Sequence, residues 1–356
     1  MAHRVIQWAT GGVGKAAIQG IVEHPDLELV GCWVHGRKKA GLDAGEIAGI
    51  GPIGVKATGD EAEILALDAD CVLYSPIMAD AAQVERLLLS GKNVVTPLGW
   101  FFPYRGSDFA ALEVACRSAG VTLHGTGIHP GGITERFPLM VSALSGSITH
   151  VRAEEFSDIR TYAAVEVVRD IMLFGKTPEE ATQSPMVHFL ANGFFQSIDM
   201  VAAELGVTLD PEKRTRHEIA VATKPIDSPI GPIEPGRVAA QRFTWEATVA
   251  GTTFMTVRTN WFMGQENLDP AWSFGPEGER FEVEITGDPT VRTSFHGLHP
   301  ASIEEGLKRN NGIVATALHC VNAIPYVCAA PPGIRTYLDL PLVSGRAAAS
   351  LRGGTR

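Results

Sequence analysis

A glycine cluster near the N-terminus has the spacing that a nucleotide phosphate requires. The sequence is A-x-G-x-x-G, with Ala9 at the position where the first glycine usually stands. Gly11 would let the backbone approach a pyrophosphate and Gly14 would let a helix pack closely on the preceding strand, so that the helical amides from Gly12 onward point at the anion. The phosphate loop G-x-x-x-x-G-K-[ST] is excluded, because it needs glycine at Ala9 and serine or threonine at Ala16. A tight turn without a ligand is the competing interpretation.

A basic cluster follows the second expected strand. A site for NAD(H) would place an acid about 20 residues after the last glycine, where it holds the ribose hydroxyls. This chain has no carboxylate there until Asp43, and instead presents His35, Arg37, Lys38 and Lys39. Because guanidinium and ammonium groups make charge-assisted bonds to a phosphate, the sequence predicts NADP(H) as the preferred cofactor and NAD(H) as the alternative. A solvated basic turn is the competing interpretation.

One histidine has the position expected of a catalytic group. His129 ends the sixth expected strand and is followed by Pro-Gly-Gly. Its imidazole could donate to a substrate oxygen or nitrogen, or transfer a proton near neutral pH. The competing interpretation is a histidine that satisfies the backbone groups of a tight turn.

A second group of reactive side chains follows the expected first strand of the second half. Strand alternation would place Glu155 and Ser157 on one face and Asp158 on the other. Tyr162 and Asp158 are expected to enter the site from the second domain, as alternative catalytic proton donors to His129. A charged strand face in solvent is the competing interpretation. Hydrolysis by an activated serine has no support, because the chain contains no G-x-S-x-G.

The elements that must position these residues alternate over the first 130 residues. Apolar strands alternate with helices, among them a short one that Asp60 would cap, one at 80–90 whose Val84, Leu87 and Leu88 share one face, and one at 108–119. This alternation predicts an α/β fold with a Rossmann-type, doubly wound parallel sheet. Residues 40–59 are rich in glycine and are expected to form a loop. Ligands bind beyond the carboxyl ends of such strands. The expected cofactor-binding residues are therefore Thr10, Gly11, Gly12, Val13, Gly14, His35, Arg37, Lys38, Ser75, Pro76, Thr96 and Pro97.

The pattern changes after residue 130. Strands at 149–159, 237–249, 252–261, 280–286 and 290–297, with helices at 163–174 and 186–205, predict a second α+β domain built on an antiparallel sheet. This domain, residues 131–310, would bind substrate and form a homodimer, because long strands such as 252–261 carry alternating apolar residues that one helical layer would leave uncovered. A final helix near 311–321 would return the chain to the first domain, residues 1–130, which the C-terminal segment of about 311–345 would complete.

Composition excludes several classes of protein. The formal net charge is −10, so no basic surface favours a nucleic-acid partner. Five scattered cysteines without a C-x-x-C pair indicate a reducing compartment, no disulfide framework and no metal site. The apolar stretch at 313–330 contains His319, Asn322 and Pro325, and is shorter and more polar than a membrane span. We expect a cytoplasmic protein that does not bind a membrane.

Several motifs together resemble a known family. The glycine turn, Ser75-Pro76 and Gly127-Ile128-His129-Pro130-Gly131 resemble the nucleotide domain of dihydrodipicolinate reductases. Glu155-Phe156-Ser157-Asp158 with Tyr162, and the late segments 321–325 and 330–333, resemble the 2,4-diaminopentanoate dehydrogenase-like family of NAD(P)H-dependent amine dehydrogenases. The resemblance spans nearly the whole chain. It implies reversible reductive amination, in which a ketone and ammonia form an imine that accepts a hydride from the nicotinamide.

Three departures from these families bear on the chemistry. The histidine–lysine signature of true dihydrodipicolinate reductases is absent, which argues against lysine biosynthesis. Amine-forming members usually carry a glutamate just after the fifth strand, whereas residues 98–102 here contain no acid. Many relatives have asparagine where this chain has His129. Either another acid substitutes for the glutamate, or the substrate is not an ordinary ketone with ammonia.

The substrate is expected to be a small ketone, aldehyde, imine or amine. Trp100 and Phe102 belong to an aromatic segment after the fifth strand that could line an apolar pocket, although a packed loop is the competing interpretation. The expected substrate-binding residues are Trp100, Phe102, Ser157, Thr316 and Asn322. The alternatives to amine chemistry are a reductase of another small carbonyl compound and a catalytically silent NADP-binding sensor.

Overall fold

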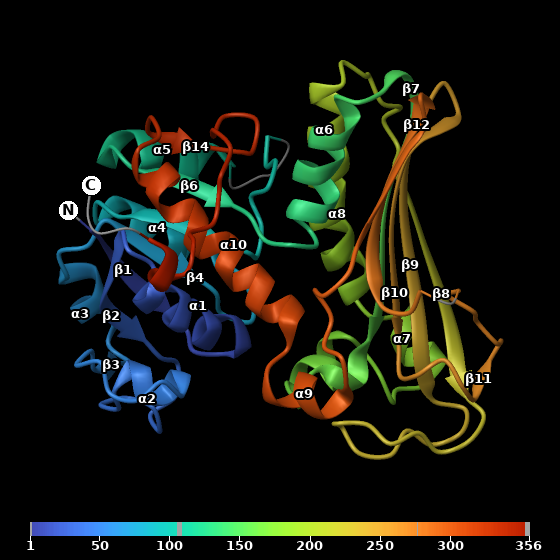
Figure 1. Cartoon of the computed structure of the whole chain (residues 1–356), viewed down its shortest axis with the longest axis horizontal. Coiled ribbons are helices and arrows are strands. Elements are labelled where there is room, and N and C mark those ends of the chain that lie inside the picture. Colours follow the sequence, from blue (N-terminus) through green and yellow to red (C-terminus); the bar gives the residue numbers. More distant parts are fainter. Residues whose placement is uncertain (1, 105–108, 276, 353–356) are drawn as a thin grey trace. The chain divides into compact units, whose positions relative to one another are not determined.

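The computed structural model describes residues 2–104, 109–275 and 277–352. The chain divides into two compact units (Figure 1). Unit 1 contains Met1–Gly131 and Ile313–Arg356, and unit 2 contains Gly132–Gly312. The end of the chain therefore returns to the unit in which the chain begins.

Unit 1 is built on a parallel sheet of seven strands in the order β14-β6-β5-β4-β1-β2-β3. The first six strands follow the order 3-2-1-4-5-6 of a doubly wound nucleotide-binding sheet, so the prediction of a Rossmann-type domain is confirmed. The strands are β1 (His3–Trp8), β2 (Leu27–Trp33), β3 (Ala57–Thr58), β4 (Cys71–Tyr74), β5 (Asn93–Thr96), β6 (Thr122–Gly125) and β14 (Gly333–Ile334).

The helices of unit 1 begin where the sequence provides caps. The Asp60 carboxylate accepts from the Ala62 amide at 2.8 Å, and Asp80 caps the helix whose Val84, Leu87 and Leu88 are fully buried. The helices are α1 (Gly12–Glu23), α2 (Ala44–Ala48), α3 (Glu61–Ala66), α4 (Ala81–Leu89), α5 (Phe109–Ala119), α10 (Asn311–Cys328) and the short η4 (Ala349–Leu351). The expected first residue of α5, Asp108, lies outside the described residues.

Two segments of unit 1 differ from the prediction. Residues 40–59 do not form a plain loop, because Asp43 accepts from the amides of Gly45, Ile53 and Gly54 at 2.8, 3.0 and 2.8 Å and so begins α2. Helix α10 continues through Pro325 to Cys328 instead of ending near residue 321. Its length and hydropathy of 1.2 would suit a membrane span, but its buried side chains belong to the core of unit 1.

Unit 2 contains a mixed sheet in the order β11-β8-β9-β10-β7-β12-β13. The ladders are antiparallel, as predicted, except that β10 pairs with β7 in parallel. The first and last strands of this order, β11 and β13, are short. The strands are β7 (Gly146–Asp158), β8 (Arg214–Ala222), β9 (Val238–Val249), β10 (Thr252–Phe262), β11 (Leu268–Asp269), β12 (Arg280–Asp288) and β13 (Val291–Phe295).

The helical segments of unit 2 are mostly short. The helix expected at 163–174 is reduced to a π-helical turn, and the helix expected at 186–205 is α8 (Met186–Glu204). The other segments are η1 (Gly132–Arg136), α6 (Phe137–Ser142), η2 (Ile159–Thr161), η3 (Val167–Ile171), α7 (Pro178–Thr182) and α9 (Ile303–Lys308).

The two faces of this sheet differ in polarity. Helices α6 and α8 cover one face of the sheet (Figure 1). This face carries the apolar side chains, and Phe194 of α8 stacks on Trp245 of β9 with 4.0 Å between the ring centroids. The opposite face carries ion pairs, with Arg152 2.9 Å from Glu282 and Arg258 3.4 Å from Glu154. The expectation of uncovered apolar residues on strand 252–261 is therefore wrong, because Met255 and Val257 of β10 are fully buried.

Candidate functional site

The glycine turn connects β1 to α1 in a conformation that leaves no room for a side chain at Gly14. A Cβ atom there would lie 2.1 Å from the Ala9 carbonyl oxygen. Ala9 itself has a φ of 73°, a left-handed conformation that glycine, the residue usually found at this position of the motif, adopts freely. The buried Gln7 amide donates to the Ala9 carbonyl at 2.9 Å and to Ser75 Oγ at 2.9 Å, which ties the turn to the end of β4.

The first turn of α1 fits an anion. Gly11 is its N-cap, and no side chain in the described residues caps it. A Cβ at Gly11 would meet nothing within 4 Å, so the approach to these amides is open. Amides without an internal partner at a helix start favour phosphate. The turn therefore fits the pyrophosphate of a dinucleotide.

The basic cluster lies beside this turn, and its Lys39 makes contacts with the turn that the sequence did not predict. Lys39 Nζ donates to the carbonyl oxygen and to Oγ1 of Thr10 at 3.0 and 3.1 Å. Burial, followed by the charge of Lys15, lowers the pKa of Lys39. His35, Arg37 and Lys38 are exposed. The cationic group that the structure ties to the glycine turn is therefore Lys39, which was not among the expected cofactor residues.

The ends of β4, β5 and β6 meet beside the turn. Ser75 Oγ lies 3.3 Å from the Trp8 carbonyl oxygen, and Ser75 leads into Pro76. Thr96 precedes Pro97, and its carbonyl oxygen accepts a hydrogen bond from the Thr126 amide at 2.9 Å. The predicted meeting of these strand ends is therefore present within unit 1.

His129 lies in a braced loop after β6. The His129–Pro130 bond is cis, and a Cβ at Gly131 would meet the Gly127 carbonyl oxygen at 2.3 Å. Residues distant in sequence hold this loop: His319 of α10 contacts the Gly127 carbonyl oxygen, and Tyr337 OH lies 3.2 Å from His319 Nδ1. Sequence reasoning missed His319 and Tyr337, because only the return of the chain to unit 1 brings them here.

The expected substrate residues of unit 1 are dispersed. Trp100 is 6% exposed and belongs to the apolar core with Trp8, as the packed-loop interpretation predicts. Phe102 contacts Tyr104 edge-on at 4.8 Å. The start of α10 lies beside the turn, since a Cβ at Gly12 would be 3.2 Å from Ile313.

The two expected substrate residues of α10 lie at different depths along this helix. Thr316 is about one turn of the helix from Ile313, whereas Asn322 lies roughly 14 Å from Ile313 along the helix axis. Asn322 is instead near Gly345, where an added Cβ would be 3.8 Å from its amide nitrogen. The structure therefore does not bring Asn322 to the glycine turn.

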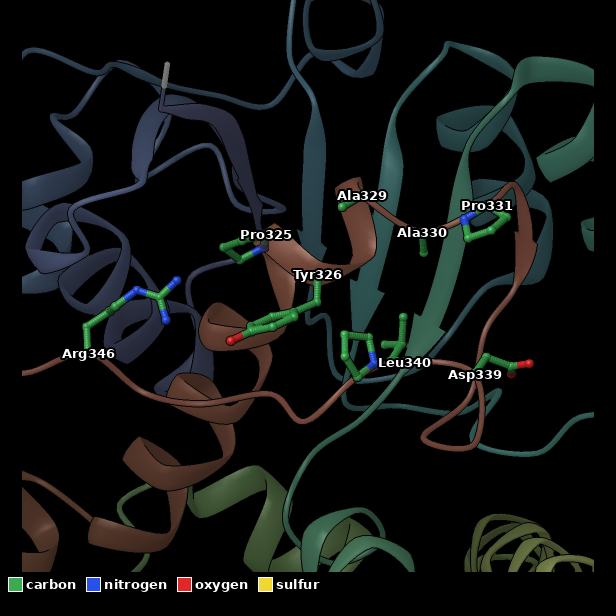
Figure 2. A pocket seen from close by; sticks show the side chains of 9 residues that line it. Pro325, Tyr326, Ala329, Ala330, Pro331, Asp339, Leu340 and Arg346 are labelled. Carbon is green, nitrogen blue, oxygen red and sulfur yellow. The ribbon is translucent and has the colours of Figure 1, made fainter. Parts of the chain in front are cut away.

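A cavity of about 350 Å³ lies at the other end of α10 (Figure 2). Figure 2 shows Tyr326 on one side and Asp339 on another. Cys328, at the end of this helix, lies against Cys71, the first residue of β4. The cavity is therefore near the amino ends of the parallel strands, away from the carboxyl ends where the glycine turn lies.

In unit 2, the predicted pair on β7 is joined by a histidine. Ser157 Oγ lies 2.6 Å from Glu155 Oε1 and 2.8 Å from His299 Nε2. Glu155 and Ser157 therefore share a face, as strand alternation predicts. Both are buried, at 6% and 3% exposed. No signal in the sequence marks His299 as their partner, because it is 142 residues from Ser157.

Asp158 and Tyr162 have different environments. The Asp158 carboxylate accepts from Arg160 Nε at 3.0 Å with both oxygens, so it acts as an acceptor. Its backbone amide donates to Glu279 Oε1 at 2.6 Å, and burial, with the nearby charges of Asp158 and Glu155, raises the pKa of Glu279 to about 7. Burial and the charges of Glu155 and Glu279 raise the pKa of Tyr162, which keeps its phenol protonated.

In the part of the chain that the structure describes, no three His, Cys, Asp or Glu residues lie close enough together to hold a metal ion.

The parallel sheet and its glycine turn define a nucleotide-binding domain of the kind that nicotinamide-dependent oxidoreductases use. More particularly, residues 135–352 match the 2,4-diaminopentanoate dehydrogenase C-terminal domain, and residues 5–96 match the dihydrodipicolinate reductase N-terminus. The chain belongs to the 2,4-diaminopentanoate dehydrogenase C-terminal domain family, and the resemblance inferred from the motifs is confirmed.

Individual relatives agree with this membership. An amine dehydrogenase from Streptomyces virginiae is 29% identical over 95% of this chain and 96% of its own length. A 2,4-diaminopentanoate dehydrogenase from Acetoanaerobium sticklandii is 24% identical over 65% of this chain and 60% of its own length. The structure of an amine dehydrogenase from Mycobacterium smegmatis has a TM-score of 0.79 at 22% identity, over 97% of this chain and 98% of that one, and shows the same fold.

Proposed function

We propose that this protein is an NADP(H)-preferring oxidoreductase of the amine dehydrogenase type. It would catalyse the reversible reductive amination of a small ketone or aldehyde, or the reduction of an imine. Membership of the family over most of the chain supports the reaction class. The observation that carries the cofactor assignment is the uncapped first turn of α1 behind an open Gly11.

The residues of unit 1 would bind and orient the dinucleotide. The cofactor supplies or accepts the hydride at its nicotinamide ring. The amides after Gly11 would hold its pyrophosphate, and Ser75 and Thr96 would border it at the strand ends. His129 would donate a hydrogen bond or a proton to the reacting oxygen or nitrogen, since an uncompensated charge there costs several kcal/mol. Tyr162, whose phenol stays protonated, is the second proposed donor, and the ion pair removes Asp158 from the proposed donors.

The preference for NADP(H) rests on the basic cluster. His35, Arg37 and Lys38 are exposed, and none of them makes a hydrogen bond or ion pair that would compete for a 2′-phosphate in the described part of unit 1. Lys39 adds a partly buried cation at Thr10. Calorimetric titration of the protein with NADPH and with NADH tests this preference. Equal or tighter binding of NADH would refute it, and binding of neither would refute the cofactor assignment.

We further propose that unit 2 binds substrate and forms a homodimer through the charged face of its sheet, and that the protein acts in the cytoplasm. Arginine and glutamate side chains alternate across this face, so two copies could pair opposite charges. The predicted dimer therefore weakens as salt increases. Light scattering at micromolar concentration that gives a monomeric mass at low salt would contradict it.

A second candidate function is a nucleotide-binding sensor without turnover. It is favoured by the absence of an acid in residues 98–102. Tight NADPH binding without turnover on a broad panel of ketones, imines and amines would support the sensor. Turnover of a carbonyl compound in the absence of ammonia would instead support a reductase of another class on the same scaffold.

A further inference from the structure

On the face of the unit 2 sheet that α6 and α8 cover, the side chains of β7 change from apolar to polar toward the carboxyl end of the strand. Val151 and Ala153 on this face are fully buried core residues. The next two positions on the same face are Glu155 and Ser157, which are also buried. Burial of a carboxylate and a hydroxyl in an apolar layer is unfavourable unless both are hydrogen-bonded, and it adds little to stability even then. Such a group invites a functional explanation.

The hydrogen bonds in this cluster assign its protons. His299 Nδ1 is buried without a hydrogen-bond partner in the residues that the structure describes, whereas Nε2 lies 2.8 Å from Ser157 Oγ. A buried donor without a partner is rarer than a buried acceptor without one, so the proton of the neutral ring lies on Nε2. The ring therefore donates to Ser157, and Ser157 donates to Glu155. Nδ1 is left as a lone pair that can accept a proton.

The ring is held in place on the sheet. It stacks on Phe281 of β12 with 4.9 Å between ring centroids and an interplanar angle of 27°. It belongs to the turn after β13, whose His296 and Gly297 are exposed. An adjustment of this turn would give a small molecule access to Nδ1.

The chain of hydrogen bonds lies near a second acidic side chain, Glu279. Glu155 and Glu279 act on the same region, and Arg160, the nearby cation, is paired with Asp158. Burial and these like charges hold the pKa of Glu279 near 7. Thr259 of β10, which lies opposite Glu155 of β7 in the sheet, is fully buried, and its Oγ1 has no hydrogen-bond partner among the described residues. Carboxylates and hydroxyl oxygens accept hydrogen bonds, so these groups suit a protonated amine, an ammonium ion or an imidazolium.

We propose that His299 is the acid–base residue of the amination step, and that Ser157 and Glu155 position its ring and stabilise its protonated form. This proposal rests on the proposed amine dehydrogenase function. It assigns to His299 the task for which residues 98–102 supply no acid.

The proposed proton transfers begin from an ammonium ion and the neutral ring of His299. An ammonium ion gives a proton to Nδ1, and the ammonia that results adds to the carbonyl carbon to form a carbinolamine. The imidazolium returns the proton to the carbinolamine hydroxyl, the C–O bond breaks, and water leaves. The nitrogen lone pair forms the C=N bond of the iminium ion. His299 ends in its starting state, so the step needs no further reactant.

The first test compares two reactions of the same enzyme. His299→Asn lowers NADPH-dependent amination of a ketone by about 10²–10⁴-fold, the usual effect of a lost general acid or base. Reduction of a preformed cyclic imine, which requires neither ammonia addition nor water loss, keeps most of its rate. His296→Asn is the matched control, because His296 is an exposed histidine of the same turn. Equal effects of the two substitutions on amination would overturn the proposal.

The second test does not depend on turnover. Nitrogen NMR of the imidazole rings in the protein without cofactor is expected to show His299 as the Nε2–H tautomer. Burial and His296 lower the pKa of His299 and Glu155 raises it. Glu155→Gln therefore lowers it further, and moves the acidic limb of the pH–rate profile to lower pH. Ser157→Ala removes the bridge between the two, and is expected to act in the same direction.

The outcomes separate the two proposals. A wild-type protein that turns over no ketone, imine or amine refutes the proposed function, while an Nε2–H tautomer in the NMR spectrum still supports the assigned protons. A Nδ1–H tautomer overturns the role of His299 whatever the activity. Normal amination by a folded His299→Asn variant overturns it while the proposed function stands. Thermal unfolding of each variant shows that it is folded.

Discussion

Replacement of Gly14 and of Gly11 by alanine separates the two roles of the glycine turn. At Gly14 the new Cβ would lie 2.1 Å from the Ala9 carbonyl oxygen and 2.9 Å from its carbon, and backbone atoms cannot move aside as a flexible side chain can. The turn or α1 must shift by more than 1 Å to reach ordinary contact. Overpacking of this kind costs about 1–3 kcal/mol. We therefore expect Gly14→Ala to lower the melting temperature by roughly 2–12 °C.

Gly11→Ala is the matched comparison. Its Cβ would meet nothing within 4 Å, and its φ of −72° is allowed for alanine, so the melting temperature should not change. The added methyl lies at the open approach to the α1 amides, and we expect NADPH affinity to fall about tenfold or more, equivalent to ~1.4 kcal/mol. Scanning calorimetry and isothermal titration measure the two effects. Normal stability of Gly14→Ala, or normal NADPH affinity of Gly11→Ala, would refute the account of the turn.

Three further predictions test individual side chains. Lys39→Ala should weaken NADPH binding by about 1.5–3 kcal/mol and NADH binding less, by calorimetry, because a charge-assisted bond is lost; equal losses would contradict a role in phosphate recognition. His129→Ala should lower kcat by about 10²–10⁴-fold while NADPH affinity stays unchanged; near-normal turnover, with loss in Tyr162→Phe, would move the donor to unit 2. Relative to wild type, Glu279→Gln should raise the stability against urea more at pH 8 than at pH 5, by on the order of 2 kcal/mol. The reason is that a carboxyl whose pKa is raised from 4.5 to about 7 favours folding only while it stays protonated. The same difference in wild type and variant would show that Glu279 titrates normally.

The sequence predicted the local features of unit 1 well. The alternation of strands and helices, the cap at Asp60, and the buried stripe of α4 depend on residues close in sequence. Helix α2 was missed because five residues with one glycine show no helical periodicity, and its start depends on Asp43 accepting amides up to 11 residues away. Strand β8 was missed because its charged first half, Arg214–Glu218, becomes a strand only by pairing with β9.

The candidate site was predicted less completely, for the same physical reason. Lys39 lies 29 residues from Thr10, and only the parallel pairing of β1 with β2 brings them together. Glu279 meets Asp158 across 121 residues because β12 pairs with β7. Strand alternation could place Glu155 beside Ser157, but no local pattern marks His299 as their partner. Side chains that act together through sheet pairing leave no signal in a single sequence.

The proposed reaction of this chain is the formation of amines from carbonyl compounds with NADPH. The most direct measurement follows the consumption of NADPH by the purified protein with a panel of small ketones and aldehydes, in the presence and absence of ammonium. We expect NADPH consumption that requires both the carbonyl compound and ammonium, detection of the matching amine by mass spectrometry, and a lower kcat/KM with NADH. Consumption independent of ammonium, or none despite tight NADPH binding, would contradict it.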